Sequence, residues 1–243
     1  MSFYQNISFK TAAIQSLASL TTSLITPNRI GEYGAKALYF DSSLRKQVLG
    51  LNLIGNLFQL LVTIVFGLIG IYYLLTNFTI HINQTTFLIC LGSILCILLG
   101  LRILYKKEIS FKGFSVRKLI AFFTRIPKSI TTKVALLSGL RYIIFSHQFY
   151  FLLILFSIDI SYIEAITGVF TMYLIAAIIP ILSLFDVVVK GSIAIWVFSL
   201  YNCNETTILT ISVIMWILNF ALPASIGSYF VLKFDTKKLI TVK

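Results

Sequence analysis

The chain has 243 residues, of which 58% are hydrophobic and only 12% are charged, and its mean hydropathy is +0.94. A soluble domain needs a largely polar surface, so this composition excludes that class and indicates a membrane protein with several spans. The formal net charge is +12, but the basic residues lie at the ends of apolar runs, where they orient spans and meet anionic head groups. We therefore expect no nucleic-acid binding.

The first apolar segment, 11–26, is too short to cross a bilayer, and so is 187–201. Runs of about 20 apolar residues, long enough to cross, predict full spans at 50–75, 86–105, 136–158, 165–184 and 207–232. We expect an all-α, polytopic membrane bundle with broken or re-entrant helices, in one transmembrane domain over residues 1–243.

The segment 11–26 and the span 50–75 carry polar stripes at helical spacing. The stripe of the span consists of Asn52, Asn56, Gln59 and Thr63, and that of the short segment of Gln15, Ser19, Thr22 and Thr26. Steps of three and four keep such residues on one face of a helix. One interpretation is hydrogen bonding between packed helices, which Gly55, Gly67 and Gly70 would bring close together. The other is a polar groove through which a lipid head group moves.

The loop 106–133 sets the expected topology, because it carries eight Lys and Arg residues against one acid, Glu108. The positive-inside rule places such a loop in the cytoplasm. The spans that follow then return the lysine-rich C-terminus to the cytoplasm. Within the loop, residues 116–126 suit a helix lying on the inner leaflet; the alternative is a solvated basic loop.

The polar cluster Ser146-His147-Gln148 falls close to the middle of the span 136–158, and Arg141 lies nearer its cytoplasmic end. A histidine at that depth is a candidate to relay protons or to hold a phosphate. The alternative is a neutral histidine bonded to a neighbouring helix. His147 is therefore a candidate site residue with a structural alternative.

Two proline-containing interruptions resemble each other. Pro27 precedes Glu32 and Lys36, and Pro180 precedes Asp186 and Lys190, so that in both cases an acid and a base stand four residues apart. This spacing favours an ion pair on one helical turn. Broken helices that meet at a shared site are typical of transporters with inverted repeats, and we expect a weak internal repeat of this kind.

The stretch 26–40, TPNRIGEYGAKALYF, resembles the signature of the lysylphosphatidylglycerol synthase transmembrane region, a flippase-like membrane domain that also occurs alone in bacterial proteins. The stretch 180–191 resembles the second proline-containing element of that family. The resemblance implies a multi-pass protein of the bacterial inner membrane that moves aminoacylated phospholipid between leaflets. It implies that Arg29, Glu32 and Lys36 line one element, with Asp186 and Lys190 as counterparts. Additional spans usually precede this region in the family, so we expect an N-terminally shortened form.

The expected function is passage of a phospholipid or related lipid-linked head group, not a reaction. Arg29 and Lys190 would attract phosphate, while Glu32 and Asp186 would meet an amine or balance the bases. The amides of Asn52, Asn56 and Gln59 would replace water around the head group. The expected partners are membrane lipids, anionic or aminoacylated, with a homo-oligomer or a partner membrane protein left open.

Two other functional classes remain as alternatives. A non-transporting membrane scaffold, or a subunit of an envelope-lipid complex, would account for the helices and the basic loop, but not for two acid–base pairs at helix breaks. An intramembrane lipid-modifying enzyme would need a nucleophile or metal ligands. The two histidines and three cysteines show no such spacing, and we expect no catalytic residues, no metal and no cofactor.

Overall fold

The structure is a computed structural model that describes residues 7–24, 26, 30–79, 110–111, 114–179 and 182–233, with 110–111, 114–119 and 183 described by their backbone alone. These residues are mostly helical, which confirms the all-α prediction. The contacts divide the chain into two compact units, one formed by Met1–Leu74 with Val134–Lys243 and the other by Leu75–Lys133.

The second unit contains a short hairpin followed by a helix. Strand β1 (Ser110–Phe111) pairs antiparallel with β2 (Phe114–Ser115), and α5 (Val116–Thr124) follows directly. Helix α5 therefore falls on the segment for which the sequence predicts a helix, while its position on a leaflet stays a prediction. The predicted span 86–105 lies outside the described residues.

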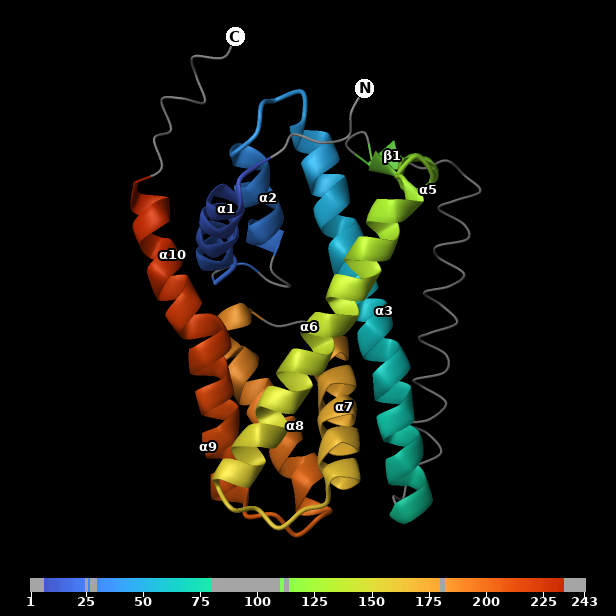
Figure 1. The fold of residues 1–243 in the computed structure, drawn as a ribbon, viewed down its shortest axis with the longest axis vertical. Coiled ribbons are helices and arrows are strands. Elements are labelled where there is room, and N and C mark those ends of the chain that lie inside the picture. Colours follow the sequence, from blue (N-terminus) through green and yellow to red (C-terminus); the bar gives the residue numbers. More distant parts are fainter. Residues whose placement is uncertain are drawn as a thin grey trace. The chain divides into compact units, whose positions relative to one another are not determined.

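The first unit is a bundle of helices (Figure 1). It includes α1 (Phe9–Thr22), α2 (Ile30–Leu38), most of α3 (Arg45–Asn77) and of α6 (Lys128–Leu155), α7 (Tyr162–Ile178), the 3-10 helix η1 (Ser183–Phe185), α8 (Asp186–Ser199), α9 (Glu205–Trp216), the π-helical turn η2 (Ile217–Ala221) and α10 (Leu222–Leu232). Figure 1 shows α9, η2 and α10 running on as one long rod.

Two helices in the described part of the chain are long and apolar enough to cross a membrane. They are α3 and the rod Glu205–Leu232, and they coincide with the predicted spans 50–75 and 207–232. Only 22% and 28% of the residues in their most apolar stretches are buried, and many of the large apolar side chains there are exposed. Exposed apolar side chains at this density match a lipid surface better than water.

The predicted span 165–184 differs from the observed helix at both ends. Helix α7 begins earlier, because Ser161 caps it and Glu164 completes a capping box with the Ser161 backbone. It ends at Ile178, and Ile179 has extended backbone angles (φ −89, ψ 113). Because a residue before proline avoids helical angles, Pro180 explains the early end. Helix α6 likewise ends at Leu155, before the predicted 158.

Small residues bring the helices of the first unit close together. The Thr21 hydroxyl of α1 donates a hydrogen bond of 2.7 Å to the Ala224 carbonyl of α10. A Cβ added at Gly70 would lie 2.6 Å from the Thr167 carbonyl oxygen of α7, and one at Gly67 would overlap Leu174. The predicted close approach at these two glycines is confirmed, whereas Gly55 faces open space.

Candidate functional site

A cavity of about 580 Å³ lies within the first unit. Side chains from α1, α2, α3, α6, α7, α8, α9 and η2 line it. The volume falls in the range of about 300–1,000 Å³ that is typical of ligand pockets. Its charged lining residues in the described chain are Glu32, Lys36, Arg141, Asp186 and Lys190.

The first ion pair of the cavity belongs to α2. Lys36 Nζ lies 2.8 Å from Glu32 Oε1, one turn along the helix, and the two side chains are only 23% and 18% exposed. The acid stands in the first turn and the base in the last, which is the favourable arrangement in the helix dipole. Helix α1 and Thr26, which follows it, hold this turn, because the Thr22 hydroxyl of α1 donates to the Gly31 carbonyl and the Gly31 N–H donates to the Thr26 hydroxyl.

The second ion pair belongs to α8. Lys190 Nζ lies 2.6 Å from Asp186 Oδ2, and these side chains are 41% and 29% exposed. Asp186 is the first residue of the helix, where a carboxylate is stabilised by the unpaired backbone N–H groups. Helix α8 packs on α9 at Gly191, where a Cβ would lie 3.0 Å from the Leu209 side chain.

The two ion pairs, which follow the two similar proline-containing interruptions of the sequence, thus line one cavity. Helices α3, α6 and α7 lie between them in the chain. An acid and a base together limit the cost of keeping charges away from water, because each partner offsets the desolvation of the other. Their relation as a structural repeat stays a prediction. Arg29, the remaining charged candidate, lies outside the described residues.

Helix α6 contributes a basic and aromatic part of the lining that the sequence analysis did not assign to the site. The Arg141 guanidinium lies 5.3 Å from the centre of the Phe145 ring. Tyr142 is buried and stacks on Phe66 of α3, with ring centres 5.1 Å apart. An arginine inside a predicted span was the available signal, because charge at such depth usually marks a functional position.

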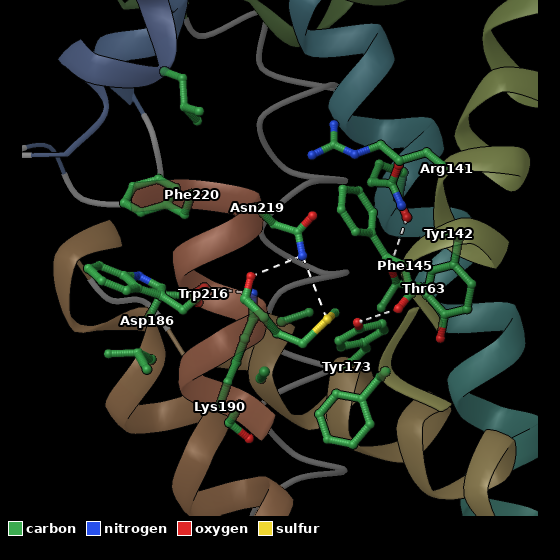
Figure 2. A pocket seen from close by; sticks show the side chains of 18 of the residues that line it. Thr63, Arg141, Tyr142, Phe145, Tyr173, Asp186, Lys190, Trp216, Asn219 and Phe220 are labelled. Carbon is green, nitrogen blue, oxygen red and sulfur yellow. Dashed lines mark hydrogen bonds and ion pairs between the residues drawn. The ribbon is translucent and has the colours of Figure 1, made fainter. Parts of the chain in front are cut away.

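The π-helical turn η2 contributes Asn219, which the sequence analysis also missed. Its Nδ2 donates to Gln148 Oε1 of α6 at 3.0 Å and to the Met215 carbonyl at 2.9 Å. Figure 2 shows Asn219 in the middle of the view, with Arg141 on one side and Trp216 on the other. Isolated π turns occur often at functional sites, but no sequence period announces them.

The amide stripe of α3 reaches the cavity only in part. Gln59 and Thr63 line it, whereas Asn52 and Asn56 are absent from its lining. The Asn56 amide donates to the Tyr33 hydroxyl of α2, so this part of the stripe joins two helices, as the packing interpretation predicts. The hydroxyls of α1 bond mainly to carbonyls of their own helix and of α2 and α10.

His147 lies outside the cavity lining, about two turns before the end of α6. Its Nδ1 is 2.9 Å from the Ile143 carbonyl oxygen and its Nε2 is 2.9 Å from the Tyr162 hydroxyl of α7. Both ring nitrogens therefore have partners within the protein. This geometry favours the structural interpretation of His147 over a role in proton relay or phosphate binding.

Two polar groups of the cavity lining are buried without a hydrogen-bond partner in the described part of the chain: the Tyr142 hydroxyl and the Trp216 indole nitrogen. Leaving a buried donor unpaired costs about 1–3 kcal/mol, so such groups call for an explanation. Within the described residues, no group of three or more His, Cys, Asp or Glu side chains is placed to hold a metal ion.

We compared the chain with protein-family models, with curated proteins and with solved structures, and none of the three comparisons found a match. The resemblance of the stretch 26–40 to a lipid-translocating membrane domain therefore stays a prediction from the sequence. What this chain does must be inferred from the charged cavity itself.

Proposed function

We propose that this protein is a multi-pass membrane protein that passes a phospholipid head group, or a related lipid-linked head group, between the two leaflets. The observation that carries the proposal is the meeting of two ion pairs and Arg141 in one cavity of a helical bundle. Exposed apolar side chains on α3 and on the rod Glu205–Leu232 supply a surface that lipid can cover.

The physical basis is replacement of water around a moving charge. A head group that leaves the aqueous phase loses its hydration, which costs many kcal/mol unless polar groups take its place. In the cavity, Lys36, Lys190 and Arg141 can attract phosphate oxygens, while Gln59, Thr63 and Asn219 offer neutral hydrogen bonds. The acyl chains would stay in the bilayer throughout.

The rest of the proposal follows the sequence. The positive-inside rule favours a cytoplasmic position for the basic loop 106–133, and with it for the C-terminus. The resemblance of the stretch 26–40 supports a bacterial inner-membrane protein of the flippase type, acting on anionic or aminoacylated phospholipid.

The test is leaflet exchange in proteoliposomes that contain phospholipids with a fluorescent acyl chain, read by quenching of the outer leaflet with dithionite. We expect exchange by the wild type and its loss in Glu32→Gln and Lys190→Ala at equal amounts of folded protein. Lys46→Ala removes an exposed lysine of α3 that does not line the cavity, and this control should exchange lipid normally.

Wild-type protein that is folded but exchanges no lipid would contradict the proposal and favour a membrane scaffold. Exchange that survives both cavity variants would place the lipid path elsewhere in the molecule.

A further inference from the structure

We propose that the cavity selects an anionic phosphodiester head group that carries no amine, and that Tyr142 and Trp216 donate hydrogen bonds to its oxygens. This inference rests on the proposed function and narrows its ligand class. Its two supports are the unpaired donors of the cavity and the balance of charge around them.

The unpaired groups of the cavity lining can be satisfied by acceptor oxygens of a ligand. Tyr142 is 3% exposed and has no partner for its hydroxyl among the described residues, and the Trp216 indole nitrogen is likewise buried and unpaired. An indole N–H is a donor only, so it can be satisfied by an oxygen but never by an ammonium group. Phosphate and ester oxygens are acceptors of this kind.

The charges of the lining favour an anion. Among its described residues, three basic side chains stand against two acids, which leaves one positive charge in excess. Each acid already has a lysine within 2.8 Å. A ligand amine would have to compete with these lysines for the carboxylates, whereas a phosphodiester with one negative charge balances the excess.

The aromatic rings offer little to an amine either. A cation binds an aromatic ring over its face. The face of Phe145 is taken by the Arg141 guanidinium at 5.3 Å, and a face of Tyr142 is taken by Phe66 at 5.1 Å. The aromatic part of the lining therefore supports Arg141 and supplies hydrogen-bond donors. It does not form a cage for an ammonium group.

The experiment compares two acyl-labelled lipids in the same proteoliposomes, phosphatidylglycerol, which is anionic and has no amine, and phosphatidylethanolamine, which has one. We expect wild-type protein to exchange phosphatidylglycerol about tenfold faster or more, because the amine of phosphatidylethanolamine meets a lining with an excess of basic groups; a tenfold factor corresponds to about 1.4 kcal/mol. Tyr142→Phe removes the hydroxyl and Trp216→Phe replaces the indole with a phenyl ring, so both keep an aromatic side chain. Both variants should exchange phosphatidylglycerol several times more slowly than the wild type, because each lacks one hydrogen bond to the phosphodiester.

A matched control is Tyr229→Phe, because Tyr229 is 54% exposed on α10 and lies outside the cavity lining. It should exchange phosphatidylglycerol at the rate of the wild type. Glycerophosphoglycerol added in solution distinguishes a free phosphodiester from one in a lipid. If it inhibits the exchange of phosphatidylglycerol, the free compound is also bound. If it does not, and the preference for phosphatidylglycerol is retained, only the lipid is recognised.

Equal exchange of both lipids, or faster exchange of phosphatidylethanolamine, would overturn this inference and leave the proposed function standing. Exchange of phosphatidylglycerol at the wild-type rate by both phenylalanine variants would overturn the assignment to Tyr142 and Trp216. No exchange of either lipid by folded wild-type protein would overturn the inference together with the function on which it rests.

Discussion

The two ion pairs of the cavity have the same spacing and nearly the same length, but they lie in different surroundings. Glu32 and Lys36 are 18% and 23% exposed, whereas Asp186 and Lys190 are 29% and 41% exposed. Water screens the second pair more strongly, so its loss should cost less stability. The comparison shows that one sequence pattern can give pairs of unequal importance, and that the packing around each helix decides which matters more.

The supports of the two helices differ as well. Helix α2 rests on α1, and α1 in turn packs on α10 at Gly227, where an added Cβ would overlap the Leu17 carbonyl. Helix α8 instead packs through the fully buried Ala194, Val197 and Phe198. A contact made largely by backbone atoms, with the Thr21 hydroxyl beside them, tolerates almost no change, whereas an aliphatic and aromatic contact can adjust its rotamers.

The change with the largest expected effect is Gly227→Ala, which targets the support of α2 and leaves that of α8 intact. The new methyl group must push α1 away from α10, at a cost of about 1–3 kcal/mol or more. We expect a clearly lower thermal transition in detergent or nanodiscs. Gly139→Ala is the matched control, because a Cβ there meets nothing within 4 Å; it should be neutral or stabilising by about 0.5–1 kcal/mol. Equal transitions for both variants would contradict the close packing of α1 and α10.

The next prediction compares Lys36→Ala with Lys190→Ala. Removing Lys36 leaves the less exposed carboxylate of Glu32 without its partner, and we expect a loss on the order of 1–2 kcal/mol, between the values for exposed and buried pairs. Removing Lys190 should cost less than about 1 kcal/mol. The measurement is chemical unfolding in mild detergent. A larger loss for Lys190→Ala would reverse the ranking of the two pairs.

A smaller effect is expected for His147→Phe, which tests a polar residue outside the cavity. The variant loses the contact with the Tyr162 hydroxyl, worth about 0.5–1.5 kcal/mol, and keeps a ring of similar shape. Lipid exchange should stay within about twofold of the wild type. Abolished exchange in a folded variant would restore His147 as a site residue and extend the path beyond the two ion pairs.

The smallest effect concerns the loop after α8. Burial, and then the nearby Glu164 carboxylate, raise the pKa of the Cys203 thiol above its ordinary value. Because the thiolate is the reactive form, maleimide should react slowly near neutral pH and faster only as the pH rises past that raised pKa. In a background that lacks Cys90 and Cys96, Gly227→Ala should leave this profile unchanged. If the rise in the maleimide reaction rate moved to a lower pH in Gly227→Ala, the packing that supports α2 and the packing that supports α8 would be coupled.

Part of this architecture could be predicted because it depends on local patterns. The apolar runs locate α3 and the rod Glu205–Leu232, and the spacing of four residues locates both ion pairs. The end of α7 was misplaced because hydropathy continues past the point where Pro180 stops the helix. A rule of local conformation there overrides the apolar run.

The remaining lining could not be predicted because it depends on how distant helices pack. Tyr142, Trp216 and Asn219 stand on α6, α9 and η2 and come together only around the cavity that these elements line, where Asn219 of η2 also bonds Gln148 of α6. Nothing in a single sequence tells a tyrosine that lines a cavity from one that packs in a core. His147 was singled out for its chemistry, but its partner Tyr162 stands on the following helix, and that neighbour decides its role.

The π turn at Ile217–Ala221 has one more consequence, for the direction in which the long rod faces. Each residue of an α-helix turns the chain by about 100°, so Ser212 and Ala224, twelve residues apart, would point about a third of a turn away from each other. The π turn absorbs about one residue and brings both onto nearly the same side, where Ser212 is buried in α9 and Ala224 in α10. If the rod were a regular α-helix of the same length through this turn, α10 would therefore be rotated by about 100°, and with it the surface that carries α1 and the Glu32 side of the cavity, whereas deleting a single residue from the turn would restore a regular helix and keep α10 in phase.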